Sequence, residues 1–377
     1  MRTAICDRFG IDLPLFAFSH CRDVVAAVTN AGGFGVLGAV AYSPEQLDTE
    51  LTWIDEHVGG RPYGVDVLVP GKIDVSAAGR GARLADAVPD RHRDFVAHLF
   101  AKYGVGGGEA VSAFAEGVGR RVTAEGATGL VDVALKHPIG LIASALGPPP
   151  PEMVGKARQA GVPVAALVGT VEHARRQVAA GADLIVAQGS EAGGHTGEIS
   201  TMVLVPQVVD AVDVPVLAAG GIADGRQMAA ALALGAEGVW CGSVWLTTQE
   251  AETPPVIREK MLAATSSDTV RSRTRTGKPA RQLRSAWTQE WESAPESPGP
   301  LPMPLQMMLS EGALARIGRA AESGNPGARE LATYFVGQVV GQLNQVKPAR
   351  QVVYDMAEEL AAAVERLRAV TSDEPRG

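Results

Sequence analysis

A short apolar segment runs directly into a glycine-rich loop at residues 182–197, which read ADLIVA followed by QGSEAGGHTG. The apolar part is typical of a parallel strand that is covered on both faces. The glycines of the loop leave the backbone open to a flat ligand and admit unusual dihedral angles. The loop also carries His195, which is able to exchange protons near neutral pH. A histidine in an arbitrary loop is usually a surface residue, but one placed directly after a buried strand predicts an active-site loop with His195 as a catalytic residue.

Eight segments of this apolar kind predict the fold class. The expected strands cover residues 13–18, 35–40, 63–69, 139–145, 162–168, 182–187, 214–219 and 238–244. Amphipathic segments such as 152–160, 171–180 and 225–234 separate most of them, and this alternation requires parallel strands with right-handed crossovers. The count predicts an α/β fold, a (β/α)8 TIM barrel. A doubly wound open sheet is the alternative, but no Gly-x-Gly-x-x-Gly follows the first strand and no acidic residue lies at ribose-binding spacing.

Two further glycine-rich loops follow the expected strands seven and eight, AAGGI at 218–222 and CGS at 241–243. In this fold the loops after these two strands commonly bind phosphate. Backbone N–H groups, the dipole of a helix start and a serine hydroxyl all favour an anion. We therefore expect Gly220, Gly221, Gly242 and Ser243 to hold a phosphate group, with glycines that only permit tight turns as the alternative.

Taken together, these motifs resemble the nitronate monooxygenase family, formerly called 2-nitropropane dioxygenases. The resemblance rests on residues 188–197, 219–222 and 240–243 and extends to NAGGFG at 30–35, GKPAR at 277–281 and the short matches at 304–306 and 337–338. It implies that FMN lies over the barrel mouth, with its phosphate at the two later loops. It also implies that Gln188 contacts the flavin and that His195 serves as the catalytic base or as a hydrogen-bond donor.

The chain departs from the usual family pattern at two positions that are expected to face the flavin. Residues 15–21 read LFAFSHC where a turn of the Pro-Met-Ala-Gly type is usual, and Asp66 stands where asparagine is usual. A carboxylate beside a flavin disfavours its reduction unless the carboxylate is protonated or paired, and His20 is the expected pairing cation. A packing histidine and a solvated aspartate are the alternative. The expected flavin contacts are Ala17, Phe18, Asp66, Gln188, Gly193 and Gly194, and the expected substrate-side or flavin-side residues are His20, Ser190 and Glu191.

The resemblance implies an FMN-dependent oxidoreductase that oxidises alkyl nitronates or nitroalkanes with O2 to carbonyl compounds and nitrite. FMN-dependent enoyl reductases, NADH:quinone reductases and flavin enzymes of steroid-ring degradation share the EAGGH loop, so an NAD(P)H-dependent enoyl or quinone reductase, or a related flavin dehydrogenase of lipid or steroid degradation, is the alternative. A flavin-free sugar-phosphate lyase or isomerase requires a lysine or glutamate at a strand end, which residues 167–169 and 218–220 lack. A non-catalytic FMN-binding module leaves His195 without a role.

Composition is consistent with a cytoplasmic enzyme that acts on a small molecule. The chain has 377 residues, 46% of them hydrophobic and 20% charged, more than the roughly 250 residues of a bare barrel. Its net charge of −8 and scattered basic residues argue against nucleic acid or an anionic membrane as partner. The three cysteines lack metal-ligand spacing and the N-terminus lacks an apolar signal region, so we expect no metal and a reducing cytoplasm. A homo-oligomer is compatible with all of these features.

The expected layout places additions on a barrel of residues 1–262. A helical insertion after strand three, residues 71–136 with a helix over 91–103, is predicted to be a lid over the barrel mouth, with a surface or oligomer contact as the alternative. Residues 263–304 are expected to form a long loop that crosses the barrel. Residues 305–370 are expected to form a C-terminal helical extension with helices over 330–343 and 350–370, before a disordered tail at 371–377.

Overall fold

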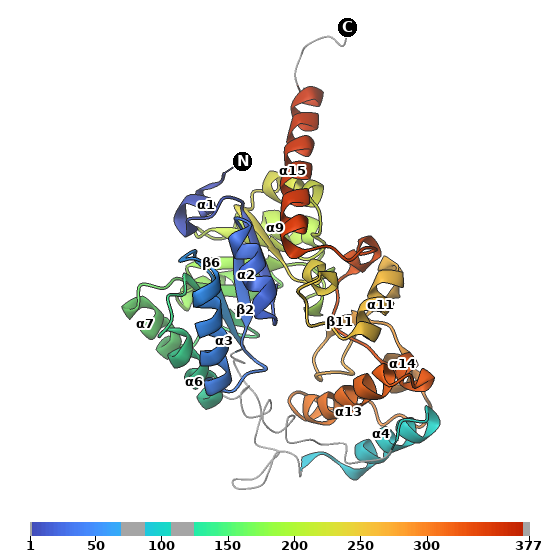
Figure 1. The fold of residues 1–377 in the computed structure, drawn as a ribbon. Coiled ribbons are helices and arrows are strands. Elements are labelled where there is room, and N and C mark those ends of the chain that lie inside the picture. The colour runs from blue at the N-terminus through green and yellow to red at the C-terminus, as the bar shows by residue number, and fades with distance from the viewer. Residues whose placement is uncertain (1, 69–86, 107–123, 372–377) are drawn as a thin grey trace.

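A closed barrel of eight parallel strands forms the centre of the computed structural model, which describes residues 2–68, 87–106 and 124–371 (Figure 1). Neighbouring strands follow the order β1-β2-β3-β4-β5-β6-β8-β9, and β9 returns to β1. The strands are β1 Leu15–Ser19, β2 Phe34–Gly38, β3 Gly64–Leu68, β4 Leu141–Ala145, β5 Val164–Val168, β6 Leu184–Gln188, β8 Val216–Ala219 and β9 Gly238–Cys241. The predicted (β/α)8 barrel is confirmed.

Helices cover the outside of the barrel because alternate strand residues point outward and are apolar. On β6, Ile185 and Ala187 pack outward with Leu204 and Val208 of the helix that follows, whereas Val186 belongs to the barrel interior. The covering helices are α2 Arg22–Asn30, α3 Pro44–His57, α6 Ala124–Ala134, α7 Pro151–Gln159, α8 Val171–Ala179, α9 Thr201–Val209 and α10 Gly225–Ala233.

Aromatic side chains fill the barrel interior and close one of its ends. Helix α1 (Ala4–Phe9) places the Phe9 ring edge-on to Phe16 and Phe34, at centroid distances of 5.3 and 5.2 Å. Trp240 stacks on both Phe16 and Phe18 at 6.3 Å, one layer closer to the carboxyl ends of the strands. The end that remains for a ligand is therefore the carboxyl end, where barrel enzymes carry their active sites.

A second apolar core lies beside the barrel. It joins α4 (Asp90–Lys102) to segments that follow the barrel. Phe95 and Leu99 of α4 pack there with Trp287 and Trp291 and with Leu309. Figure 1 shows α4, α11, α13 and α14 as one group at the side of the barrel. The helices of this group are α11 Pro255–Ala263, α12 Ala286–Ser293, α13 Leu305–Glu322 and α14 Pro326–Leu331. The predicted helix over 91–103 is confirmed. The remainder of the insertion up to α6, residues 71–86 and 107–123, lies outside the described residues, so the lid stays a prediction.

The segment 263–304 is not the loop that the sequence predicts. It contains strands β10 (Thr269–Ser272) and β11 (Ala280–Leu283), followed by α12. These strands form an antiparallel sheet of order β10-β11-β7, in which β7 is the two-residue strand Gly194–His195. The prediction is wrong because each strand is only four residues long and its polar side chains find partners within the sheet, such as the Arg281 Nη1 bond to Thr269 Oγ1 at 3.1 Å. The pairing holds the His195 loop in place.

The C-terminal region returns to the barrel. Helix α15 (Ala349–Thr371) confirms the helix predicted over 350–370, and its Val352, Met356 and Leu360 join the outer core beside α10 and α2. The helix predicted over 330–343 is wrong, because α14 ends at Leu331 and only the short helix η4 (Gln338–Gln342) follows. Residue 371 ends α15, and 372–377 lie outside the described residues. In the described parts of the chain, no helix combines the length and the apolarity required to span a membrane.

Candidate active site

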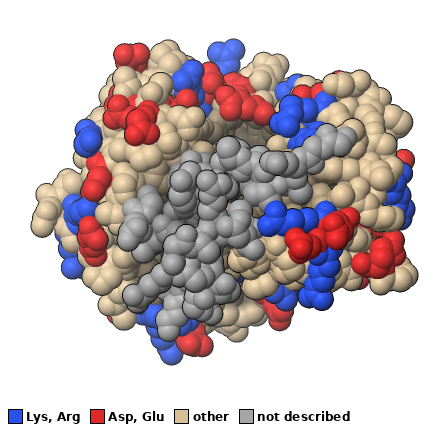
Figure 2. Space-filling view, turned by 90° about the horizontal axis from the view of Figure 1, so that it is seen from below, with Lys and Arg blue, Asp and Glu red and all other residues tan. Residues whose placement is uncertain are grey.

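Polar side chains interrupt the apolar barrel interior at the carboxyl ends of the strands. Asp66 pairs in register with Gly38 on the neighbouring strand, and its neighbours Val65 and Val67 pack outward, so its own side chain points inward. Gln188 follows the inward-facing Val186 by two residues and shares this direction. Figure 2 shows the molecule from below, the end opposite α1, where acidic and basic side chains border a hollow. The predicted residues on β3 and β6 therefore meet at the barrel mouth.

His20, directly after β1, and Asp66 on β3 approach this mouth on either side of β2 but do not form the predicted ion pair. The His20 Nδ1 atom lies 3.0 Å from the Gly38 carbonyl oxygen, and its ring stands edge-on to Phe18 at 5.1 Å. Desolvation lowers the pKa of His20, although its side chain keeps solvent contact, as expected in a concave site. Burial raises the pKa of Asp66 to about 7, and only 7% of the residue is exposed. Both shifts favour the neutral form and so weaken the salt bridge that the sequence predicts.

His195 is fixed by strand pairing and by one hydroxyl group. It pairs with Ala280 across β7 and β11, and its Nε2 atom lies 2.8 Å from Thr276 Oγ1. The Thr276 hydroxyl also donates to the Lys278 carbonyl at 3.2 Å. Because a hydroxyl has one proton, the Nε2–H of His195 then donates to Thr276 and Nδ1 is left unprotonated. Burial, with smaller contributions from Lys278 and Arg275, lowers the pKa of His195 to about 4. His195 is therefore a neutral imidazole at pH 7, able to accept a proton.

A buried ion pair lies close to this histidine. Arg275 bonds to Glu311 of α13 through Nε–Oε1 at 2.8 Å and Nη2–Oε2 at 3.2 Å. The guanidinium carbon lies 4.4 Å from the centre of the Phe335 ring, which is itself 6.0 Å from the His195 ring. The sequence analysis did not find Arg275, Glu311 or Phe335. Six basic residues within 269–284 of an acidic chain are the signal that could have pointed to this hairpin.

The predicted phosphate loops converge on the His195 loop. Gly220 and Gly221 have left-handed φ values of 94° and 72°, which glycine adopts without strain. Ser243 Oγ accepts a hydrogen bond from the Gly337 amide at 2.8 Å, and a Cβ on Gly337 would lie 3.0 Å from the Gly193 nitrogen. The structure thus brings residues 193, 220–221 and 243 together with Gly337, which the resemblance alone had placed in the family's C-terminal region.

Two glycines leave open space at these loops, which fits a flavin phosphate and ring. A Cβ on Gly194 would meet nothing within 4 Å, and one on Gly242 would have only ordinary contact with Phe18 at 3.7 Å. The start of α10, in contrast, is already capped. The Asp224 side chain accepts from the Gln227 amide and Glu359 accepts from the Gly225 amide, each at 2.8 Å. These two bonds occupy amides that the helix start was expected to offer to phosphate, which leaves the glycine amides and Ser243 as the candidates for that role.

The side chains of two predicted site residues, Glu191 and Ala17, and the backbone of a third, Ser190, serve the scaffold. The Glu191 carboxylate accepts hydrogen bonds from the Thr201 amide at 3.1 and 3.0 Å, and from the Thr201 hydroxyl at 2.9 Å, so it caps α9 and is not free for substrate. The Ser190 backbone bonds to Ile199 and Arg281 at 2.8 Å each. The Ala17 side chain is fully buried in the outer core, away from the mouth. The local sequence does not show which way these side chains point or which backbone groups they bind.

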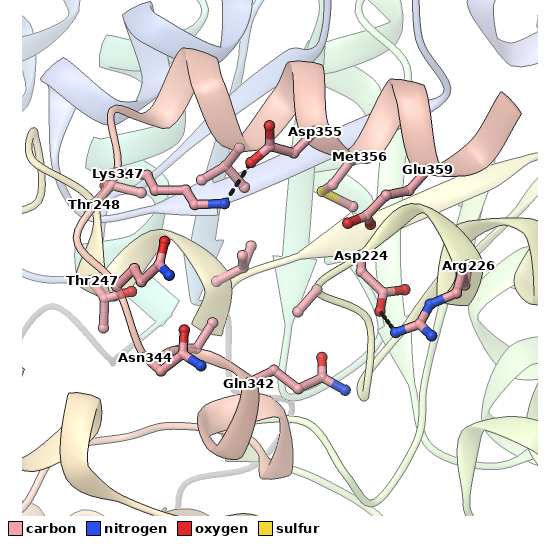
Figure 3. Close-up of a pocket in the computed structure, with 15 residues that line it drawn as sticks. Asp224, Arg226, Thr247, Thr248, Gln342, Asn344, Lys347, Asp355, Met356 and Glu359 are labelled. Carbon is pink, nitrogen blue, oxygen red and sulfur yellow. Dashed lines mark hydrogen bonds and ion pairs between the residues drawn. The ribbon is translucent and has the colours of Figure 1, made fainter. Parts of the chain in front are cut away.

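A cleft of about 250 Å³ opens on the outside of the barrel, between α10 and α15 (Figure 3). Four of its five charged side chains are paired with one another. Lys347 bonds to Asp355 at 2.7 Å, and Arg226 bonds to Asp224 at 3.0 Å. Its apolar wall includes Met356, which belongs to the outer core. The cleft is a seam where the C-terminal helix docks, distinct from the site around His195.

One cluster within the described residues has a metal-ligand composition. Ligand atoms of Cys21, Asp23 and Glu252 lie within 4.8 Å of one another. The Cys21 thiol, however, donates to the Glu250 carbonyl at 3.0 Å, and burial raises its pKa. A protonated thiol is a poor metal ligand because the thiolate is the binding form. This cluster therefore gives no reason to assign a metal, and the absence of one stays a prediction.

A parallel barrel that places a histidine beside glycine-rich loops at its carboxyl end is the architecture of many cofactor-dependent (β/α)8 enzymes. The sequence pattern described as nitronate monooxygenase matches residues 14–359, and the chain belongs to this family. It is an oxidoreductase of a flavin-dependent family.

Similar proteins support this assignment. A Mycobacterium tuberculosis protein named "Putative monooxygenase Rv1533" is 62% identical over 373 residues, 98% of this chain and 99% of that protein. A Rhodococcus jostii protein named as a hydroxy-methyl-oxo-octahydroindene-carboxyl-CoA dehydrogenase is 42% identical over 76% of this chain and 66% of its own length. The solved structure of nitroalkane oxidase from Streptomyces ansochromogenes has a TM-score of 0.79 and 29% identity, covering 97% of this chain and 100% of that one.

Proposed function

We propose that this chain binds FMN and oxidises alkyl nitronates with O2 to carbonyl compounds and nitrite, and that it accepts neutral nitroalkanes through proton removal by His195. The observation that carries the proposal is the neutral imidazole of His195, held through Nε2 by Thr276 at 2.8 Å beside an open glycine loop. The relatives named for nitroalkane oxidation and monooxygenation support the same chemistry.

The residues present fit FMN. Gly220, Gly221, Gly242 and Ser243 would hold its phosphate, because backbone amides and a hydroxyl suit an anion and two of these glycines have conformations that other residues avoid. The residues that would border the ring are Phe18, Asp66, Gln188, Gly193 and Gly194. When bound, FMN supplies the electron acceptor for the substrate and the route of those electrons to O2.

The chain's own contribution to catalysis is the handling of one proton. His195 would accept the α-proton of a nitroalkane at Nδ1, while Thr276 keeps Nε2 protonated and holds the ring in place. Phe18 and Trp240, whose rings stack at 6.3 Å, would form an apolar floor at the barrel mouth that keeps water out of the barrel interior. A preformed nitronate lacks the α-proton and does not require this step.

A second candidate function is favoured by one comparison. The relative that is 42% identical is named as a dehydrogenase of a coenzyme A ester, not as a monooxygenase. A flavin dehydrogenase of lipid or steroid degradation, or an NAD(P)H-dependent enoyl or quinone reductase, would use the same phosphate loops and the same histidine. The two functions differ in the redox partner, O2 in one and a nicotinamide or acceptor substrate in the other.

The deciding experiment compares the two redox partners on one preparation. The purified protein is expected to show visible flavin absorption, to release FMN on denaturation, and to consume O2 with an alkyl nitronate. NADH or NADPH should leave the flavin oxidised under anaerobic conditions. Rapid anaerobic reduction by either nicotinamide, without nitronate turnover, would replace the first proposal by the second, and a preparation that cannot take up FMN would contradict both. Cytoplasmic location and homo-oligomeric assembly stay predictions.

A further inference from the structure

His195, His20, Asp66 and the Arg275–Glu311 pair together offer an anionic substrate no net counter-charge. His195 is neutral, and the shifts of His20 and Asp66 favour their neutral forms. Arg275 is positively charged, but the Glu311 carboxylate neutralises it through two hydrogen bonds of 2.8 and 3.2 Å. An alkyl nitronate carries one negative charge, and moving it into a desolvated mouth is costly unless a cation compensates.

Lys278 has the properties that this role requires. It lies on the turn of the β10–β11 hairpin, and its side chain is half-buried. Within residues 2–68, 87–106 and 124–371, no side chain forms an ion pair or hydrogen bond with its ammonium group, and burial alone lowers its pKa. An unpaired, partly desolvated ammonium group is unfavourable by itself and is stabilised by any anion that reaches it.

The position of Lys278 is tied to that of His195. Thr276 Oγ1 lies 2.8 Å from His195 Nε2 and contacts the Lys278 carbonyl oxygen and amide nitrogen at 3.2 and 3.3 Å. Among charged side chains, Lys278 lowers the pKa of His195 most, and only burial lowers it more. Thr276 therefore fixes the backbone of Lys278 relative to the imidazole of His195.

The hairpin concentrates positive charge in a chain of net charge −8. Six of its residues between 269 and 284 are basic, and two of these pair with carboxylates, Arg271 with Glu198 at 3.1 Å and Arg275 with Glu311 at 2.8 Å. A local excess of one sign beside a concave site raises the concentration of ligands of the opposite sign.

We propose that Lys278 binds the negatively charged group of the substrate beside His195, so that the site selects small organic anions, with the nitronate form preferred over the neutral nitroalkane. This inference rests on the proposed function for the identity of the substrate but not for the presence of the anion site. In this arrangement Lys278 binds the negative charge of the substrate and His195 removes its α-proton.

The test uses the flavin-loaded enzyme with nitrite as the anionic probe, followed through the visible spectrum of the bound flavin. Lys278→Met removes the charge at similar length, and Lys278→Arg keeps it. Arg284→Gln is the matched control, because it removes one charge from an exposed position on the same hairpin. The dissociation constant of nitrite is expected to rise ~10-fold or more in Lys278→Met, to stay within about 2-fold of wild type in Arg284→Gln, and to recover in Lys278→Arg.

The same variants are then compared on ethylnitronate and on neutral nitroethane. In Lys278→Met the KM for the nitronate should rise by a similar factor, whereas the KM for nitroethane should change little. The flavin content and the melting temperature of this variant should match those of wild type. Equal nitrite affinity in wild type and Lys278→Met, or a wild-type enzyme that binds no nitrite, overturns the proposal. A changed midpoint potential with unchanged nitrite affinity also overturns it, since Lys278 would then serve the flavin. Lysine-dependent nitrite binding without nitronate turnover supports the anion site and contradicts the proposed function.

Discussion

Arg275 and Glu311 form a buried, two-bonded ion pair that ties the β10–β11 hairpin to α13, with Nε–Oε1 at 2.8 Å and Nη2–Oε2 at 3.2 Å. The side chains are only 11% and 17% exposed. Because the same hairpin positions His195, this pair links the second apolar core to the active site at the barrel mouth.

Replacing Glu311 with glutamine should destabilise the protein strongly. The substitution leaves the Arg275 charge buried without a counter-ion, and breaking such pairs typically costs ~3 kcal/mol. The Arg329–Glu259 pair is the control, since its side chains are 50% and 59% exposed, and Glu259→Gln should cost less than about 1 kcal/mol. The free energy of unfolding from urea titrations measures both. Equal losses in the two variants would show that burial of the Arg275–Glu311 pair has no energetic consequence.

Replacing His195 with asparagine should separate proton removal from flavin binding. The variant is expected to keep its bound flavin, because the phosphate contacts come from other loops, and to lose ~10²-fold or more of its turnover of a neutral nitroalkane. Turnover of the preformed nitronate should fall much less, because that substrate has no α-proton to remove. Steady-state rates on both substrates provide the measurement. Equal losses would assign His195 to binding, and undiminished rates on both would exclude it from catalysis.

The pH dependence of nitroalkane turnover should report the lowered pKa of His195. A base acts in its unprotonated form, and His195 keeps this form above its pKa of about 4. The acidic limb of kcat/KM is therefore expected near pH 4, not near the usual histidine value of about 6.5. Lys278→Met should move this limb to higher pH, since removal of the neighbouring positive charge makes His195 easier to protonate. An acidic limb near the usual value in wild type would show that His195 is not desolvated or not the base.

Asp66 should make the protein less stable as pH rises. Its pKa is raised to about 7 in the folded state from 3.8, so between these values the folded protein holds a proton that the unfolded chain has lost. Stability is then greatest at acidic pH and falls as pH rises through about 7. Asp66→Asn removes this titrating carboxyl group. Its free energy of unfolding should exceed that of wild type by ~2–4 kcal/mol at about pH 8 and should differ little at about pH 4.

The midpoint potential of the bound flavin gives a second measurement on Asp66. If the carboxylate borders the flavin, Asp66→Asn should raise the potential above about pH 7, because a negative charge next to the reduced ring is removed. An unchanged or lowered potential would place Asp66 away from the flavin even if the stability prediction holds.

The sequence predicts the barrel well, and it predicts which loops follow the strand ends, because both depend on local patterns. Inward and outward alternation on a strand and glycines at a strand end are visible within a few residues, as on β6 and at Gly220. Side chains whose direction is set by distant contacts could not be predicted. Glu191 caps α9 ten residues later, and Arg275 finds Glu311 at a separation of 36 residues. The helix expected over 330–343 fails for the same reason, since Gly337 and Gln338 bond to other loops, Gln338 to the Glu191 carbonyl at 2.9 Å.

Replacing Gly337 with alanine should damage both stability and flavin retention. A Cβ at this position would lie 2.6 Å from the Glu191 carbonyl oxygen and 3.0 Å from the Gly193 nitrogen, so the backbone of the His195 loop or of residue 337 must shift. Overpacking of this kind costs ~1–3 kcal/mol. Gly318→Ala on α13 is the matched control, because its Cβ would meet nothing within 4 Å, and it should stabilise the helix by ~0.5–1 kcal/mol. Melting temperature and the fraction of FMN retained after gel filtration test both variants. Full FMN retention by Gly337→Ala would show that this contact is not part of the cofactor site.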